Sequence, residues 1–395
     1  MRRSGRRITL KHIIWTAICL ICLLLVGVLQ IVSARMQKQL LHERVAYDWD
    51  SEGGSAHISV YLTEEEKLSM LSSLEDQEYM VLNLYYSLES ELTENSITLS
   101  EDASDNARLI VYGYEAEGSV SIESDRTTIT VKAYGVGGDF FQFHPLQLKY
   151  GSYFSGSDLM QDGVLLDEEA AWQLFGSSDV VGQYVYISNI PHLVVGVYER
   201  DRGYFYDAAG NDESTVYLSA QSLFQYGSYN GLQSVELLMP NPVSGFAYDL
   251  VAEQLSGYDV AIVENENRFE WLNLADIWKQ IGTRSMGLNG IVFPYWENVA
   301  RGYEDVLAGI LLIQAVLLSF VLVVLVISLW KAWLRRNWRT RDVVSKLGDL
   351  WYEQGAKRQK KKNEKNGEEP YPFAILTFED DEENEEVFSE KNEEQ

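Results

Sequence analysis

Two long apolar runs constrain this chain more than any other feature of its sequence. The first covers residues 13–33 and the second residues 306–330, and only a few polar side chains interrupt either run. A helix rises about 1.5 Å per residue, so each run is long enough to cross a hydrocarbon core of roughly 30 Å. The sequence therefore predicts two transmembrane helices, separated by a long polar segment.

Positive charges on the outer flanks of the two runs indicate the orientation. The flanking cations are Arg2, Arg3, Arg6, Arg7 and Lys11 before the first run, and Lys331, Arg335, Arg336, Arg339 and Arg341 after the second. The positive-inside bias then places both termini in the cytoplasm and the segment between the helices outside the cell membrane. A cleaved signal peptide is the alternative for the first run, since Val32-Ser33-Ala34 resembles a cleavage site. Its apolar core exceeds the roughly 7–15 residues of such peptides, which favours an uncleaved anchor.

The same features divide the multi-pass chain into five parts. They are a basic cytoplasmic N-terminus (1–12), the first span (13–33), an extracytoplasmic domain with stalk helices (34–305), the second span (306–330) and a cytoplasmic tail (331–395). The tail begins as a basic amphipathic helix and ends in an acidic stretch typical of disorder. Its helix either lies on anionic lipid or docks a cytoplasmic partner.

Net charge and cysteine content exclude several classes of protein. The net charge of -27 would repel a phosphate backbone, so nucleic acid is not an expected partner, whereas the lipid bilayer is. Cys19 and Cys22 are the only cysteines, and both lie inside the first apolar run. We interpret them as apolar packing residues, and we expect no disulfide in the outer domain.

The outer segment mixes strand-like and helix-like patterns. Three runs at residues 108–114, 119–123 and 127–134 are rich in Val, Ile, Thr and Tyr, with polar turns predicted at Glu117-Gly118 and Ser124-Asp125. Helical patterns precede and follow these runs. The sequence therefore predicts an α+β domain with helices on a largely antiparallel or mixed sheet.

No residue pattern in the chain indicates chemistry. The five histidines, His12, His42, His57, His144 and His192, lack the spacing of a zinc helix, and neither a Walker motif nor a nucleophile elbow occurs. The glycine cluster at 135–143 lacks the Lys-Ser/Thr of a phosphate loop, so we predict a turn there, followed by aromatic side chains that cover the core. We predict no catalytic, cofactor-binding or metal-binding residue, and no enzymatic activity.

One segment, Tyr150–Val197, has a distinct local pattern of strand, helix and hairpin. A short apolar strand ends at Asp167, which is predicted to cap a helix with acidic residues in its first turn, and Gly176 is predicted to end that helix. Two further strands follow, joined by a tight turn at Asn189 and Pro191. The pattern indicates a packing unit rather than a reactive site.

The residues of this segment resemble a known family. The matching motifs are VLLDEEAAWQLFG (164–176), VVGQYVYI (180–187) and HLVVGV (192–197), with AYGVGGDFF (133–141) upstream. They resemble the extracytoplasmic core domain of the MacB/FtsX-type ABC transporter permeases, most specifically over residues 132–203. In that family the domain follows the first membrane helix, as it does here.

The resemblance implies a non-catalytic permease-like subunit whose outer domain handles substrate or couples mechanically to a cytoplasmic ABC ATPase. Permeases of the family carry three further helices after the outer domain, whereas this chain carries one. The resemblance therefore implies a multi-span permease partner, and a homo- or hetero-oligomer is compatible with this role. A stand-alone sensor or scaffold that signals through its cytoplasmic tail is the alternative hypothesis.

Overall fold

The computed structural model describes residues 10–40, 45–50, 54–71, 73–99, 107–156, 158–280, 293–334, 351 and 353–354. The chain forms two compact units, Met1–Val323 and Val324–Gln395, and the fold described below belongs to the first. Most of the cations that indicate the orientation, and nearly all of the tail, lie outside the described residues.

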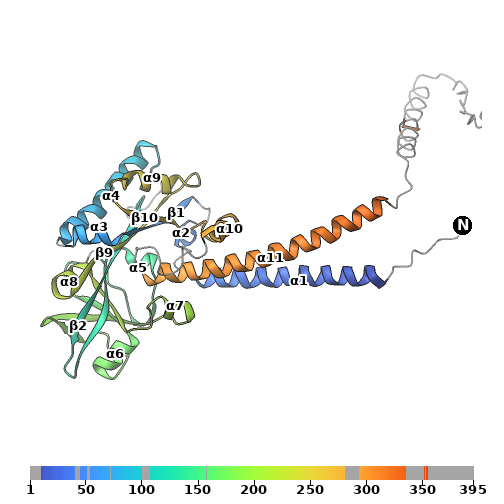
Figure 1. The fold of residues 1–395 in the computed structure, drawn as a ribbon. Coiled ribbons are helices and arrows are strands. Elements are labelled where there is room, and N and C mark those ends of the chain that lie inside the picture. The colour runs from blue at the N-terminus through green and yellow to red at the C-terminus, as the bar shows by residue number, and fades with distance from the viewer. Residues whose placement is uncertain are drawn as a thin grey trace, which may run out of the picture. The chain divides into compact units, whose positions relative to one another are not determined.

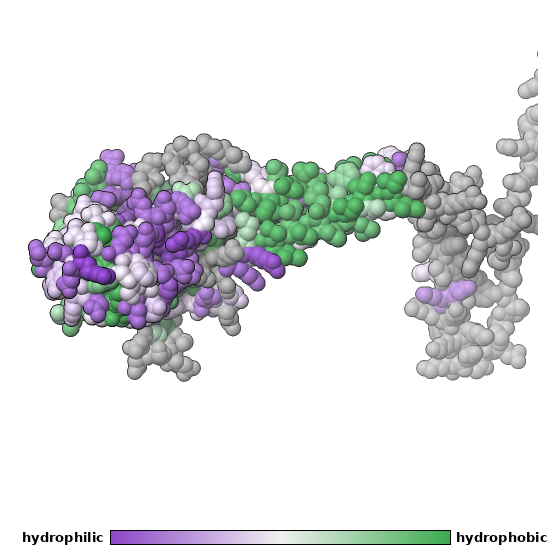
Figure 2. Space-filling view, turned by 90° about the horizontal axis from the view of Figure 1, so that it is seen from below, coloured by the Kyte–Doolittle hydropathy of each residue, from purple (hydrophilic) through white to green (hydrophobic). Residues whose placement is uncertain are grey.

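Two helices of the described residues are long and apolar enough to cross a membrane: α1 (Leu10–Gln39) and α11 (Tyr295–Leu334). Within the first unit they lie side by side (Figure 1), and their apolar surface contrasts with the polar surface of the outer domain (Figure 2). Gln314 of α11 is buried between them and donates from Nε2 to Gln30 Oε1 of α1 at 3.2 Å. This amide pair links the two helices within their apolar segments.

Ten strands of the described residues form one mixed sheet in the order β10-β1-β9-β2-β3-β8-β5-β7-β4, with β6 pairing β2 and β7. Their bounds are β1 Ser55–Leu62, β2 Val111–Glu123, β3 Thr128–Gly138, β4 Gln147–Gly151, β5 Gly163–Asp167, β6 Tyr184–Ile187, β7 Ile190–Glu199, β8 Thr215–Ser219, β9 Ser228–Pro240 and β10 Val260–Glu264. The β3–β8 and β5–β7 pairs are parallel and the others antiparallel. The predicted α+β class is confirmed.

The turn predicted at Glu117-Gly118 is wrong because both residues lie within a strand, and the turn predicted in the glycine cluster begins later than expected. Residues 111–114 of the first run and the whole run 119–123 belong to the single strand β2. The predicted turn at Glu117-Gly118 coincides with register shifts against β9. Gly135–Gly138 continue β3, and the chain turns only at Asp139, before the predicted aromatic side chains, of which Phe140 is buried. A Cβ on Gly135 would lie 2.8 Å from a side-chain carbon of Leu223, so the glycine allows close approach of sheet and helix.

Helices on one face of the sheet bury two apolar clusters. Helices α3 (Glu64–Met70), α4 (Leu74–Glu94) and α9 (Phe246–Gln254) lie over β1, β9 and β10, where Ile58, Val60 and Leu237 are fully buried. Helices α6 (Glu168–Phe175) and α8 (Ala220–Tyr226) lie over β3, β5 and β8. The alternation of strand side chains leaves every second residue for the opposite face.

The segment with the family motifs folds into the predicted strand, helix and hairpin, but Pro191, predicted in the hairpin turn, lies in β7 opposite Tyr186. The Asp167 carboxylate accepts a hydrogen bond of 2.6 Å from the Ala170 N–H and caps α6, and Gly176 ends the helix at φ +73°. Ser188 and Asn189 both have positive φ and form the two-residue turn between β6 and β7.

The first turns of α11 occupy the opposite face of the sheet, together with α5 (Phe140–Phe143) and α7 (Tyr204–Ala208) (Figure 1). The remaining helices are α2 (Val45–Trp49), which contacts β1, and α10 (Trp271–Gln280), which packs on α11. A helix long enough to cross the membrane thus begins inside the outer domain, against its central strands.

Candidate functional site

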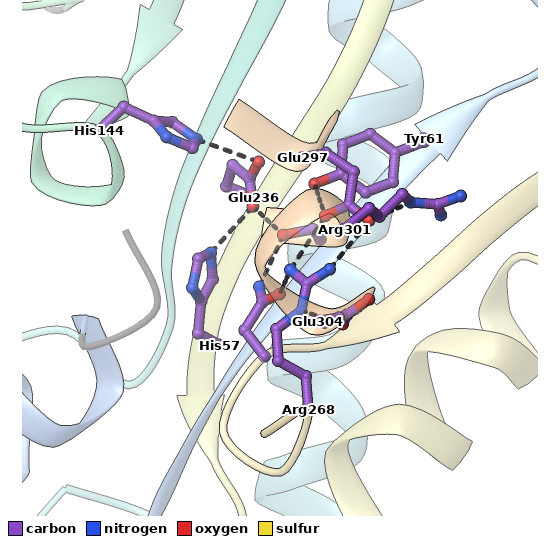
Figure 3. A network of polar contacts seen from close by, with 10 residues as sticks. His57, Tyr61, His144, Glu236, Arg268, Glu297, Arg301 and Glu304 are labelled. Carbon is purple, nitrogen blue, oxygen red and sulfur yellow. Dashed lines mark hydrogen bonds and ion pairs between the residues drawn. The ribbon is translucent and has the colours of Figure 1, made fainter. Parts of the chain in front are cut away.

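The candidate site is a buried polar network where α11 meets the sheet (Figure 3). Ten residues contribute, from β1, the end of α5, β9, the segment after β10 and α11: His57, Ser59, Tyr61, His144, Glu236, Asn265, Arg268, Glu297, Arg301 and Glu304. The even-numbered residues of β1 fill the apolar core, so the odd-numbered ones face α11. Glu297, Arg301 and Glu304 have the i, i+4, i+7 spacing that places them on one side of a helix.

Glu236 is the centre of the half of the network formed by the sheet. Its side chain is fully buried, and its two oxygens lie 2.9 Å from His57 Nε2 and 3.1 Å from His144 Nε2. The Ser59 hydroxyl donates to Glu236 Oε2 at 2.5 Å. One carboxylate of β9 therefore binds side chains of β1 and of the segment after α5.

A relay of side chains joins this half of the network to α11. Asn265 donates from Nδ2 to Ser59 Oγ at 2.8 Å and accepts at Oδ1 from Arg268 at 3.2 Å. Arg268 donates from Nη1 and Nη2 to the two oxygens of Glu297, at 3.0 Å each, and from Nε to Glu304 at 2.7 Å. This guanidinium thus binds two carboxylates of α11 from the segment after β10.

A second guanidinium completes the ionic cluster on α11. Arg301 donates from Nε to Glu297 Oε1 at 2.6 Å, and its guanidinium carbon lies 3.6 Å from the centroid of the Phe293 ring. The Tyr61 hydroxyl of β1 donates to Glu297 Oε2 at 3.3 Å. Two arginines and two glutamates balance in charge, as a buried ionic cluster requires.

The network favours the charged form of two of its carboxylates, Glu236 and Glu297. Burial by itself would raise the pKa of Glu236, but hydrogen bonds from His144 and His57 outweigh burial and hold that pKa well below its usual range. Burial likewise opposes ionisation of Glu297, and the charges of Arg268 and Arg301 overcome it and lower the pKa. Burial lowers the pKa of His144, which is therefore neutral at pH 7 and serves Glu236 as a hydrogen-bond donor.

The other side of α11 packs through aromatic side chains. Tyr295 and Trp296 are buried in a cluster with Tyr134, Tyr217 and Phe140, whose residues come from β3, β8 and α5. The Trp296 ring also lies 4.3 Å from the imidazole of His144, measured between ring centroids. The polar side of α11 thus binds the β1–β9–β10 end of the sheet, and its aromatic side binds the β3–β8 end.

Substitution of Gly302 tests how closely α11 packs against the outer domain. A Cβ at this position would lie 2.4 Å from Phe205 of α7. We expect Gly302→Ala to lower the free energy of unfolding by about 1–3 kcal/mol, since overpacking forces ring and backbone to shift. Denaturant unfolding of the full chain in micelles measures this effect.

Gly309→Ala is the matched control in the same helix, because a Cβ on Gly309 would meet no atom within 4 Å. It should leave the free energy of unfolding unchanged or raise it slightly. Equal effects of the two substitutions would contradict close packing at Gly302.

The sequence patterns singled out only part of this site. The spacing of His57 and His144 indicates no zinc helix. In the structure both imidazoles contact the carboxylate of Glu236. His192 lies elsewhere, within hydrogen-bonding distance of Ser222, and the side chains of His12 and His42 lie outside the described residues. In the described part of the chain no group of three or more His, Cys, Asp or Glu side chains could hold a metal ion.

The ionic residues on α11 and β9 were missed, although the sequence contains a signal for them. Glu236 stands in the run Ser234–Leu238, which is otherwise suited to burial, and Glu297, Arg301 and Glu304 share one helix side directly before an apolar span. Charged residues in such positions require buried partners. The sequence does not show which residues pair with these charges.

Comparison with known proteins places this architecture in a family. The family model of the MacB-like periplasmic core domain matches residues 18–256. A macrolide export ATP-binding/permease protein MacB from Chromobacterium violaceum is 30% identical over an alignment 122 residues long, which covers 26% of this chain and 19% of that protein. One from Neisseria gonorrhoeae is 32% identical over 81 residues, 20% of this chain and 13% of that protein. The chain thus aligns with less than a fifth of the length of either relative.

Two solved structures align with part of the chain. The periplasmic region of MacB from Actinobacillus actinomycetemcomitans aligns with 59% of this chain and 95% of its own, at 17% identity and a TM-score of 0.36. The extracellular domain of the ABC-type transporter YknZ aligns with 53% of this chain and 98% of its own, at 14% identity and a TM-score of 0.31.

Proposed function

The chain belongs to the MacB-like periplasmic core domain family of ABC transporter permeases, and on that premise we propose that it is a non-catalytic membrane subunit of such a transporter. Its outer domain, residues 34–305, handles substrate or passes movement between the membrane and the outside. Both termini lie in the cytoplasm, and the spans are residues 13–33 and 306–330.

The observation that carries this proposal is the continuity of α11. The helix runs without a break for 40 residues, from Tyr295 to Leu334. Its first turns are held by buried ionic contacts on one side and by aromatic packing on the other, and its apolar run begins at Val306. A helix is stiff over this length, so a tilt or shift of the membrane part moves the strands that hold its first turns.

In this proposal, partner proteins supply the energy source and further membrane helices. The relatives are named as ATP-binding/permease proteins, and no Walker motif occurs in this sequence, so the proposed energy source is a separate cytoplasmic ABC ATPase. A multi-span permease is the second proposed partner, and it provides further membrane helices next to α1 and α11. The subunit works without a cofactor of its own, in a homo- or hetero-oligomer.

Purification of the tagged full chain from native membranes under mild detergent tests this proposal. We expect an ABC ATPase and a multi-span permease to co-purify in constant ratio to the chain, whereas a tagged single-span protein of equal abundance should recover neither. Recovery of neither protein, under conditions that keep other ABC transporters intact, would sink the proposal.

Removal of the tail after Trp351 distinguishes the transporter subunit from the stand-alone sensor. A sensor that signals through its tail loses its function completely in this variant while its outer domain stays folded. A transporter subunit without the tail keeps its outer domain and its α1–α11 pair. It also keeps its permease partner if the two proteins contact each other in the membrane.

A further inference from the structure

Helix α10 connects the outer domain to the point where α11 becomes apolar. Leu274 and Ile277 of α10 are buried against Leu307 and Ala308 of α11, and Met36 of α1 packs on the same cluster. The Trp278 indole donates from Nε1 to the Ala308 carbonyl at 2.9 Å. Figure 1 shows α10 beside α11 near the place where α11 leaves the sheet.

These contacts define the depth of α10 relative to a membrane that α11 crosses. The apolar run of α11 starts at Val306, so Leu307 and Ala308 lie at its outer end. A hydrocarbon core of roughly 30 Å takes about 20 residues of helix, which places these two residues at the border between lipid tails and headgroups. Helix α10 therefore lies at the level of the outer lipid–water interface.

The side chains that α10 leaves uncovered suit that interface. Trp271 is 66% and Leu272 55% exposed, although the other apolar side chains of this helix pack inward. Lys279 is exposed near them and pairs with Asp276 at 2.6 Å. Trp beside aliphatic and cationic side chains is the composition of a helix that lies along a bilayer surface.

Helix α1 adds positive charge at the same level. Arg35 and Lys38 are exposed and flank Met36, which belongs to the cluster that α10 covers. These cations stand out on a chain with a net charge of -27. A cationic rim on an acidic protein fits the phosphates of a lipid surface.

We propose that α10 is an interfacial helix that binds the outer leaflet of the membrane. Trp271 and Leu272 enter the border between headgroups and acyl chains, and Lys279, Arg35 and Lys38 bind lipid phosphates. Since α10 also contacts α1 and α11, it fixes the height of the outer domain above the bilayer. The inference rests on the part of the proposed function that has α11 crossing the membrane, and it is independent of any protein partner.

Depth measurements with a fluorescent label on Leu272→Cys test this proposal. The full chain, with Cys19 and Cys22 replaced by alanine, is reconstituted in vesicles of phosphatidylcholine and phosphatidylglycerol. Fluorescence is quenched by iodide in the water or by lipids that carry a spin label near the headgroup or at mid-chain. Val243→Cys, at a 69% exposed site on the outer domain, is the matched control, and Leu322→Cys in the apolar part of α11 is the depth reference.

The proposal expects the label at position 272 to be quenched several-fold more by the shallow spin label than by the mid-chain one, and to be shielded from iodide. Trp271→Ala combined with Lys279→Ala should restore iodide quenching several-fold, whereas Trp271→Phe should not. Equal iodide quenching at positions 272 and 243, with Leu322→Cys still quenched at mid-chain, would overturn this proposal alone. A Leu322→Cys label that iodide reaches would instead overturn the membrane crossing of α11, and this proposal with it.

Discussion

Replacing Glu297 with alanine is expected to lower the free energy of unfolding of the outer domain by about 3–5 kcal/mol, as for other buried ion pairs that lose one partner. Glu297 is only 1% exposed and accepts hydrogen bonds from Arg268, Arg301 and Tyr61. Without it, two buried guanidinium groups face each other with one carboxylate, Glu304, left to balance them. The loss should loosen the attachment of α11 to the β1–β9–β10 end of the sheet.

Urea unfolding of the full chain in micelles, followed by tryptophan fluorescence, measures this effect. The Trp296 ring beside His144 makes the fluorescence sensitive to separation of α11 from the sheet. Asp276→Ala is the control, because the Asp276–Lys279 pair is exposed and its loss should change the free energy by no more than about 0.5 kcal/mol. If Glu297→Ala were no more destabilising than this control, the ionic cluster would not hold α11.

Replacing Glu115 with glutamine is expected to remove part of the pH dependence of stability. Glu115 is fully buried on the face of the sheet that α11 covers, and burial, with Glu117 nearby, raises its pKa to about 8. Its Oε1 has no hydrogen-bond partner among the described residues. Because the pKa is raised in the folded state, this group's contribution is fully present below pH 4.5 and is lost as pH rises to about 8.

The free energy of unfolding, measured across that pH range for both chains, checks this expectation. At about 1.4 kcal/mol per pKa unit, the upper limit of the Glu115 contribution is about 5 kcal/mol, so a difference of a few kcal/mol should accumulate between the two ends of the range. His144, whose pKa is lowered by burial, acts with opposite sign in both proteins, so comparison of the two chains isolates Glu115. Asp276→Asn, in the exposed pair with Lys279, should keep the slope of the parent chain. An unchanged slope in Glu115→Gln would show that this carboxyl is ionised in the folded protein.

Local structure was largely predictable from sequence wherever a short stretch of chain contains its own partners. The Asp167 cap and the Gly176 helix end each depend on residues within a few positions of one another, and both predictions are confirmed. The β6–β7 turn lies at Ser188 and Asn189, so its prediction is right for Asn189 and wrong for Pro191. The turn predicted at Glu117-Gly118 is wrong because polar and glycine residues also occur at β-bulges. Whether such residues turn the chain or bulge a strand depends on the neighbouring strand, here β9, which lies more than a hundred residues away in sequence.

The sequence by itself determined two helices long and apolar enough for a membrane, an α+β domain between them and the family to which that domain belongs. Composition and short-range periodicity are sufficient for these features, since each depends on burial or lipid contact along a continuous stretch. Only the tertiary structure decided that Glu236 binds two histidines, and that Arg268 joins β1 and β9 to Glu297 on α11. A buried charge shows in sequence that it needs a partner, but which distant residue supplies the opposite charge is set by how the strands and helices pack.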